Sequence, residues 1–257
     1  MYLTPLYKTC EGRDVQTPGP SAIYPLPPDY RDLTSVGRRL ARINACSLQR
    51  TSNEYVAAWN FFRRWYLHLM EGCQLYAGDI SESPPFHYEM VHAMAEHHYA
   101  TRACPRGFAK STITDENILL RSFTRPMHAT LMCLASHDLL EERFGIFQDT
   151  LMNNDMLQQD FPGLIPKRNE GQFNLSMIQL KNGARIKGVV THGKKRGTKP
   201  RPHWIVLDDP EFDPSETTDM GKTRREFKRR LFQVLIPCGA KESQLWWPGT
   251  IISRQLS

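Results

Sequence analysis

Residues 99–123 read YATRACPRGFAKSTITDENILLRSF, and this stretch decides the fold. YATRAC predicts a short strand, and the segment that starts at Lys110 predicts a helix. Between them, CPRGFAKS ends in Lys-Ser, as a phosphate-binding loop does. Cys104 and Ala109 stand at two positions where such loops carry glycine. The question is whether this loop binds a nucleotide or merely precedes a helix.

A loop between a strand and a helix can bind phosphate, because the free N–H groups and the positive end of the helix face the anion. Lys110 can reach the β- and γ-phosphates, and Ser111 can place its hydroxyl on Mg²⁺. Gly107 allows a tight turn, whereas Ala109 needs a negative φ or accepts strain. Arg106 adds a charge that could contact a phosphate or brace the loop. The alternative is a helix start that contains Lys-Ser by chance.

A second feature is the sequence HWIVLDDPE, in which the apolar residues from Trp204 to Leu207 predict a buried strand. A P-loop enzyme needs a carboxylate at the end of a neighbouring strand to hold Mg²⁺, and a second one to orient or deprotonate water. Asp208 lies where the metal carboxylate belongs. Asp209 is the candidate for the water, with Glu211 as the alternative. An acidic turn after a strand would look the same, but its pairing with the Lys-Ser loop favours a P-loop NTPase.

The remaining pattern predicts an α/β fold with a mostly parallel sheet flanked by helices. We expect strands at 128–135 and in QLWWPGTIIS, and a helix at 136–154 with Leu139 on its apolar face. A basic amphipathic helix is expected in TTDMGKTRREFKRRLFQVLIP. In SMIQLKNGARIKGVV, a hairpin with a type I′ turn at Asn182-Gly183 is expected.

The first part of the chain differs in composition. Residues 1–36 are proline-rich and predict an extended arm, and residues 37–80 look helical with a stop at Gly72. We therefore expect an N-terminal arm and helical extension over 1–80, followed by a P-loop domain over 81–257.

Composition narrows the class of protein. The 257 residues carry a net charge of +6, and residues 194–230 hold eleven Lys and Arg against seven Asp and Glu. Clustered basic charge suits a polyanion, or it is a solvated loop and helix face. No apolar run predicts a membrane span, and the N-terminus lacks a signal peptide. The six cysteines are scattered and do not have the spacing of zinc ligands, so we predict free thiols in a reducing compartment.

Several motifs occur in an order that resembles a known family. PRGFAKST, ASHDLLEERFGIFQDTL, IVLDDPE and PGTIIS resemble, in this order, the ATPase domain of phage large terminase subunits. The resemblance covers roughly residues 80–255 and implies a P-loop NTPase of the RecA/ASCE-like type. It implies an ATP hydrolase with Mg²⁺ that translocates double-stranded DNA into a procapsid, in the cytoplasm of the infected bacterial host. Its partners would be the portal protein, the small terminase subunit and further copies of the chain in a ring, which is a pentamer in this family. No membrane is implied.

The resemblance also assigns residue roles. The nucleotide loop would comprise Cys104, Pro105, Arg106, Gly107, Phe108, Ala109, Lys110, Ser111 and Thr112. Ser111 and Asp208 would serve the metal. The catalytic carboxylate of this family directly follows the metal carboxylate and is often Glu. Here that position is Asp209, one methylene shorter, so the base stays open between Asp209 and Glu211.

Three further residues match weaker family features. Thr250, in Gly249-Thr250, resembles a coupling motif in which a hydroxyl senses the γ-phosphate, or it is a strand-end turn. Arg196 resembles an arginine that reaches a neighbouring subunit's nucleotide, or it belongs to a basic loop that contacts DNA or solvent. His87 lies in a segment that resembles the adenine-pocket segment of the family, where a glutamine is often found. Either His87 takes the place of that glutamine, or Phe86 and Tyr88 pack on the adenine.

Duplex DNA would be held by its phosphates without sequence reading. The candidate contacts are Lys194, Lys195, Lys199, Arg201, Arg224, Arg225 and Lys228. Some of them could instead be subunit-contact or surface residues. The clustered aspartates of a terminase nuclease domain are not found, so we expect the N-terminal ATPase portion of a longer protein and no nuclease activity from it. Two alternatives stay open: another P-loop DNA translocase or helicase-type NTPase, and a DNA- or portal-binding module that does not hydrolyse ATP.

Overall fold

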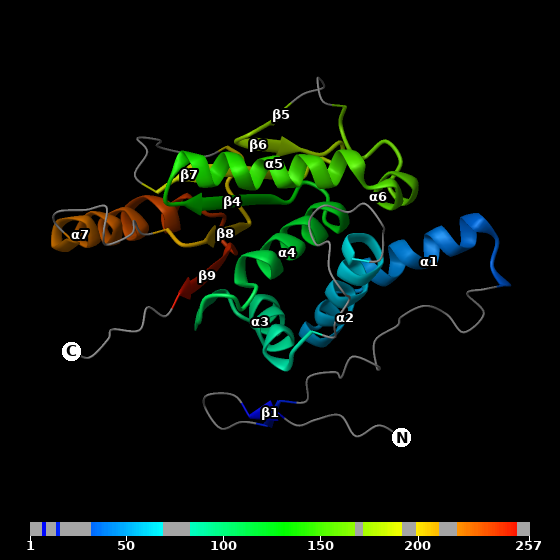
Figure 1. The fold of residues 1–257 in the computed structure, drawn as a ribbon, viewed down its shortest axis with the longest axis horizontal. Coiled ribbons are helices and arrows are strands. Elements are labelled where there is room, and N and C mark those ends of the chain that lie inside the picture. Colours follow the sequence, from blue (N-terminus) through cyan, green and yellow to red (C-terminus); the bar gives the residue numbers. More distant parts are fainter. Residues whose placement is uncertain are drawn as a thin grey trace. The chain divides into compact units, whose positions relative to one another are not determined.

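The computed structural model describes residues 7–8, 14–15, 32–68, 83–167, 172–191, 199–210 and 220–250 (Figure 1). The chain divides into two compact units. The first comprises residues 1–96 with 153–162, and the second comprises 97–152 with 163–257. Across the described part of the chain, no helix is long and apolar enough to span a membrane.

The described part of the first unit is mainly helical. Its elements are the paired strands β1 (Tyr7–Lys8) and β2 (Asp14–Val15), the helices α1 (Ser35–Ser47), α2 (Ser52–Phe62), α3 (Pro85–Glu96) and α6 (Asp155–Asp160), and the π-helix η3 (Arg63–His68). A capping box between Thr51 and Glu54 starts α2. The predicted helical extension is therefore present over the described residues, whereas Gly72 lies outside them. The boundary at residue 80 stays a prediction; α3 and α6 belong to the first unit.

A buried ion pair joins α6 to the preceding helices of this unit. Arg42 Nε and Nη2 each donate to the carboxylate of Asp160 at 2.5 Å, and the hydroxyl of Tyr66 donates to the same carboxylate at 2.7 Å. Burial, together with Cys46 and Asp160, raises the pKa of Tyr66. The pair explains how a segment far along the sequence joins the N-terminal helices.

The second unit alternates strands and helices. Its elements are β3 (Tyr99–Cys104), α4 (Lys110–Thr124), β4 (Ala129–Leu134), α5 (His137–Asn153), β5 (Phe173–Asn174), β6 (Met177–Gln179), β7 (Arg185–Val190), β8 (Trp204–Leu207), α7 (Met220–Arg230), the π-helix η6 (Leu231–Leu235), α8 (Ile236–Cys238) and β9 (Gln244–Thr250). The described strands form a sheet in the order β3-β9-β8-β4-β7-β6-β5. From β3 to β7 neighbours are parallel, and β6 and β5 are antiparallel additions. The predicted α/β class with a mostly parallel, helix-flanked sheet is confirmed.

Helices cover both faces of this sheet. On one face, Phe227 of α7 and Leu231 of η6 pack against alternate residues of the central strands, among them Leu131 and Ile205. On the other face, α4 and α5 lie over the sheet; the Arg121 guanidinium of α4 lies 3.9 Å from the Trp204 ring centroid. All four residues of β8 are buried, which accounts for its continuous apolar run.

Two local expectations are wrong. Gly183 has φ +83, but Asn182 does not have positive φ, and Gly183 N donates to Leu180 O at 2.9 Å. The turn is therefore not type I′: a turn over Lys181 and Asn182 ends in a left-handed glycine, and the Asn182 side chain accepts from Ala184 N. Leu139 is 45% exposed and does not belong to the buried face of α5.

Candidate nucleotide-binding site

The loop from β3 to α4 contains two left-handed residues. Gly107 has φ +81, and no described atom beyond its chain neighbours lies within 4 Å of a Cβ built there. Ala109, the residue before α4, has φ 50 and ψ 25. Ala109 therefore accepts strain, because a left-handed conformation costs a residue with a Cβ about 1–2 kcal/mol. The backbone follows a tight turn at both positions, although only one of them is glycine.

The start of α4 has the features of an anion site. Alanine at the N-cap has no polar side chain, so no side chain of this residue caps the first-turn N–H groups. Lys110 is 7% exposed, and its ammonium donates to the carbonyl oxygen of Pro105 at 3.1 Å. Ser111 and Thr112 are half-buried, while Arg106 and Phe108 are exposed. The lysine thus lies over the loop that would enclose the phosphates.

Asp208 lies directly after β8 and is 2% exposed. Its backbone N–H donates to Cys133 O in β4 at 3.1 Å, which fixes it at the carboxyl end of the parallel strands. Ligands bind at this edge in open α/β sheets. The sequence prediction that Asp208 follows a buried strand is therefore confirmed.

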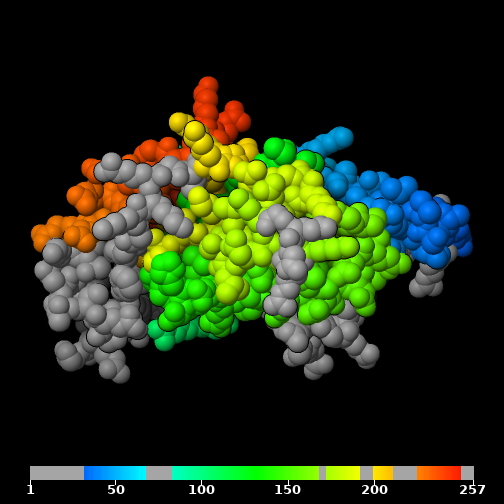
Figure 2. All heavy atoms as spheres, turned by 90° about the horizontal axis from the view of Figure 1, so that it is seen from above, coloured from blue at the N-terminus to red at the C-terminus, as the bar shows by residue number. Residues whose placement is uncertain are grey.

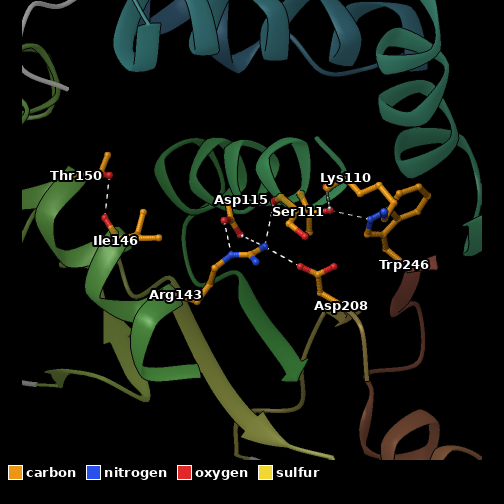
Figure 3. Close-up of polar contacts among 9 residues, drawn as sticks. Lys110, Ser111, Asp115, Arg143, Ile146, Thr150, Asp208 and Trp246 are labelled. Carbon is orange, nitrogen blue, oxygen red and sulfur yellow. Dashed lines mark hydrogen bonds and ion pairs between the residues drawn. The ribbon is translucent and has the colours of Figure 1, made fainter. Parts of the chain in front are cut away.

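A partly buried arginine, Arg143, joins α4 to this aspartate (Figure 3). Arg143 of α5 donates through Nε and Nη2 to both carboxylate oxygens of Asp115 in α4, at 2.5 and 3.0 Å. Its Nη2 also donates to Ser111 O at 3.1 Å and to Asp208 Oδ2 at 2.7 Å. One guanidinium therefore contacts both the first turn of α4 and the acidic end of β8.

The electrostatics of this group follow from burial and pairing. Burial raises the pKa of Asp115 to about 6, although Arg143 opposes the shift. Burial alone would lower the pKa of Arg143, but Asp115 and Asp208 outweigh it and raise this pKa. Arg143 therefore stays charged between two aspartates.

The site fits a magnesium nucleotide on two observations. Asp208 Oδ1 is buried and has no hydrogen-bond partner among the described residues. The backbone at Gly107 is open to an approaching group. In the described part of the chain, no group of three or more His, Cys, Asp or Glu could hold a metal. A site with one carboxylate and one hydroxyl suits Mg²⁺, which keeps its waters and binds substrate phosphates rather than a full protein cage.

Asp209 is exposed and has φ 41, a left-handed backbone that breaks the alternation of the strand. Strained backbone of this kind clusters at functional sites. Glu211, the alternative, lies outside the described residues, so the choice between the two carboxylates stays open.

The last strand brings the Gly249-Thr250 motif to the same edge. In the parallel pairing of β3 with β9, Gly249 lies opposite Ala103 and Thr250 opposite Cys104, where the loop begins. The backbone of Thr250 is thus next to the start of the loop; its side chain lies outside the described residues.

The other candidates are dispersed or not described. Lys194, Lys195, Arg196 and the side chain of Arg224 lie outside the described residues. Lys199, Arg201, Arg225 and Lys228 are exposed. Figure 2 shows the surface of α7, which carries the last two, in orange. His87 lies in α3 of the first unit, with its ring 4.4 Å from the Phe86 ring.

Sequence reasoning missed Arg143 and Asp115. A signal was present in α5, since the buried stripe of Leu140, Phe144 and Phe147 has Arg143 on its flank. A charged residue beside a buried stripe needs a partner. The sequence does not reveal which carboxylate that partner is.

No protein-family model and no curated protein matches the chain. The structure is similar to a mutant of the large terminase ATPase domain of a Thermus phage, with a TM-score of 0.42, 13% identity and 63% of each chain covered. It is also similar to the Phi-28 gp11 DNA packaging motor, with a TM-score of 0.37 and 14% identity. That match covers 60% of this chain and 47% of the motor chain. The chain thus spans less than two thirds of either structure.

Proposed function

We propose that the chain is the ATPase motor domain of a viral terminase large subunit, which hydrolyses ATP and translocates double-stranded DNA into a procapsid. The observation that carries the proposal is the joint contact of Arg143 with Ser111 O at 3.1 Å and Asp208 Oδ2 at 2.7 Å. It supports a single site made from the Lys-Ser loop and the acidic strand end, the two parts that a P-loop NTPase requires.

In this site the chain's own residues would bind the nucleotide and the metal and orient the attacking water. The first-turn N–H groups of α4 and the ammonium of Lys110 would hold the phosphates, and the Ser111 hydroxyl with Asp208 would hold the metal. Bound Mg²⁺ would neutralise charge on the phosphate oxygens. Lys110 now donates to Pro105 O, which is a neutral acceptor, and an anionic phosphate oxygen would be a stronger acceptor for the same ammonium.

Asp209 or Glu211 would orient the attacking water and accept its proton. Arg196 would act on the nucleotide of a neighbouring copy. The loop containing Cys104, Pro105, Arg106, Gly107, Phe108, Ala109 and Thr112 would enclose the phosphates.

Coupling to DNA would run through β9. Its Thr250 pairs with Cys104 at the root of the loop, so a change in the loop can reach this strand directly. Duplex DNA would contact Lys194, Lys195, Lys199, Arg201, Arg224, Arg225 and Lys228 through its phosphates. The motor would work as a ring with portal protein and small terminase subunit, in the cytoplasm of an infected bacterium.

The test measures ATP hydrolysis and the binding of a fluorescent ATP analogue by the wild type, Lys110→Ala and Asp208→Ala. We expect hydrolysis by the wild type, with and without blunt duplex DNA, and a loss of about 100-fold or more in each variant. Lys110→Ala removes a positive charge at the phosphates, and Asp208→Ala removes the carboxylate that would hold Mg²⁺. A wild type that neither binds nor hydrolyses ATP would exclude an enzyme and favour the binding module. Strand displacement in place of blunt-duplex translocation would favour a helicase-type NTPase.

A further inference from the structure

The buried group around Arg143 has a charge imbalance. Arg143 supplies one positive charge, and Asp115 and Asp208 supply two negative charges when both are ionised. Asp115 is 4% exposed and Asp208 is 2% exposed, so water screens neither carboxylate well. A buried group with excess negative charge is costly unless a cation compensates it.

The hydrogen bonds of the guanidinium are unequal. Arg143 holds both oxygens of Asp115 but only Oδ2 of Asp208. The remaining oxygen, Asp208 Oδ1, is buried without a partner among the described residues. A buried carboxylate oxygen in this state has lost its water and gained nothing in return. The unpaired oxygen and the excess charge both indicate that a cation or its bound water belongs beside Oδ1.

We propose that Arg143 is a positioning residue for the metal carboxylate. Resting on the proposed nucleotide site, it anchors Asp208 through Oδ2 so that Oδ1 alone faces the metal, and Asp115 fixes Arg143 in that orientation. Since Arg143 also holds Ser111 O, the same side chain sets the separation between the metal carboxylate and the residue whose hydroxyl would serve the metal. The fork of Nε and Nη2, which a lysine ammonium lacks, holds Asp115, while Nη2 also donates to Ser111 O and Asp208 Oδ2.

The experiment titrates Mg²⁺ against binding of a fluorescent ATP analogue and compares the Mg²⁺ concentration at half-maximal binding. The variants are Arg143→Gln, Arg143→Lys and Asp115→Asn. The matched control is Arg121→Gln, which removes a fully buried arginine of α4 that contacts Trp204 and Gln244. Binding in EDTA and the melting temperature are measured for every variant.

We expect Arg143→Gln to raise the half-maximal Mg²⁺ concentration by about tenfold or more, as loss of an outer-shell partner does at metal sites. Asp115→Asn should also raise the half-maximal Mg²⁺ concentration. Arg143→Lys should give a value between those of the wild type and Arg143→Gln. Binding in EDTA should change less than about twofold, because the residues that hold phosphate are retained. Arg121→Gln should lower the melting temperature without changing the Mg²⁺ dependence.

An unchanged Mg²⁺ dependence in Arg143→Gln, or full recovery by Arg143→Lys, would overturn the positioning role while leaving the nucleotide site intact. A wild type that does not bind the analogue would overturn the proposed function and this inference with it. Where Arg143→Gln does not fold, Arg143→Lys decides, because it keeps the charge between the two aspartates: wild-type Mg²⁺ dependence overturns the role, and a raised half-maximal concentration supports it.

Discussion

The indole Nε1 of Trp246 in β9 donates to the hydroxyl of Thr114 in α4, at 3.0 Å. Thr114 in turn donates to the carbonyl oxygen of Lys110 at 2.8 Å, and Trp246 and Thr114 are both buried. Because β9 ends at Thr250, these bonds connect the strand of the proposed coupling motif to the first turn of the helix that follows the loop.

Replacing Trp246 with Phe removes the indole donor while keeping an aromatic ring in the core. We expect a loss of about 1–3 kcal/mol in the free energy of unfolding, since a buried hydroxyl loses a partner. Urea unfolding of Trp246→Phe, Thr114→Val and the double variant forms a double-mutant cycle. The double variant should cost about 1 kcal/mol less than the sum of the single variants. Additive costs would show that the two side chains do not stabilise each other.

The left-handed backbone at Ala109 predicts that glycine at this position makes the protein more stable. We expect Ala109→Gly to stabilise the protein by up to about 1 kcal/mol, because removal of the Cβ relieves strain that exceeds the entropy cost of glycine. The control is Ala240→Gly, at a half-buried alanine that does not have positive φ, which should destabilise by about 0.5–1 kcal/mol. Equal losses in both variants, measured by urea unfolding, would contradict strain at Ala109.

The sequence predicts features that short patterns determine. The strand before the loop ends at Cys104, the helix begins at Lys110, and β8 ends before Asp208, because apolar runs and punctuating residues mark these positions locally. Their convergence at one edge follows from the parallel sheet.

Contacts between distant charged residues are not predictable in the same way. Arg143 reaches Asp115 and Asp208, which are 28 and 65 residues away, and Arg42 reaches Asp160 over 118 residues. Such partners depend on tertiary packing, and several buried carboxylates compete for each arginine. The turn at Asn182-Gly183 was missed for a local reason: the Asn182 side chain bonds Ala184 N and Ser122 O, which favours a conformation other than type I′.

The buried imidazole of His128 predicts a loss of stability in mild acid. Burial lowers its pKa to about 2, and Arg121, Arg125 and His203 add to the shift. The native imidazole therefore stays neutral, while the unfolded chain binds a proton below pH 6.5. Its contribution to stability is complete above pH 6.5 and falls by up to about 1.4 kcal/mol per pH unit as the pH drops from there toward 2.

Urea unfolding between pH 7 and 5.5 measures this slope. His128→Phe keeps a ring in place of the imidazole and should make the fall in stability shallower over that interval. The control is His98→Gln at an exposed histidine, which should keep the wild-type slope. Parallel curves for the wild type and His128→Phe would show that His128 does not titrate on unfolding.

The exposed cations of α7 predict a salt-dependent interaction with duplex DNA. In the double variant Arg225→Ala/Lys228→Ala, log affinity should fall less steeply with log salt. The magnitude of the slope should decrease by up to about 2, since each phosphate contact contributes about 0.9. Fluorescence anisotropy with a blunt duplex measures the slope. The control, Lys241→Ala at an exposed lysine outside α7, should leave it unchanged. A slope that neither change affects would place the DNA contacts elsewhere.

We predict that Asp209, whose backbone is left-handed, rather than Glu211 is the group that orients water. A strained conformation directly after Asp208 turns the Asp209 side chain out of the alternation of β8, and strain of this kind is retained where a site requires it. We expect Asp209→Asn to lower kcat by about 100-fold or more at unchanged affinity for the ATP analogue, since general-base catalysis contributes about 10²–10⁴. Glu211→Gln is the matched change and should lower kcat less than about threefold. The reverse result would assign the base to Glu211, and a loss of ATP binding in Asp209→Asn would mean that Asp209 holds the nucleotide instead of the water.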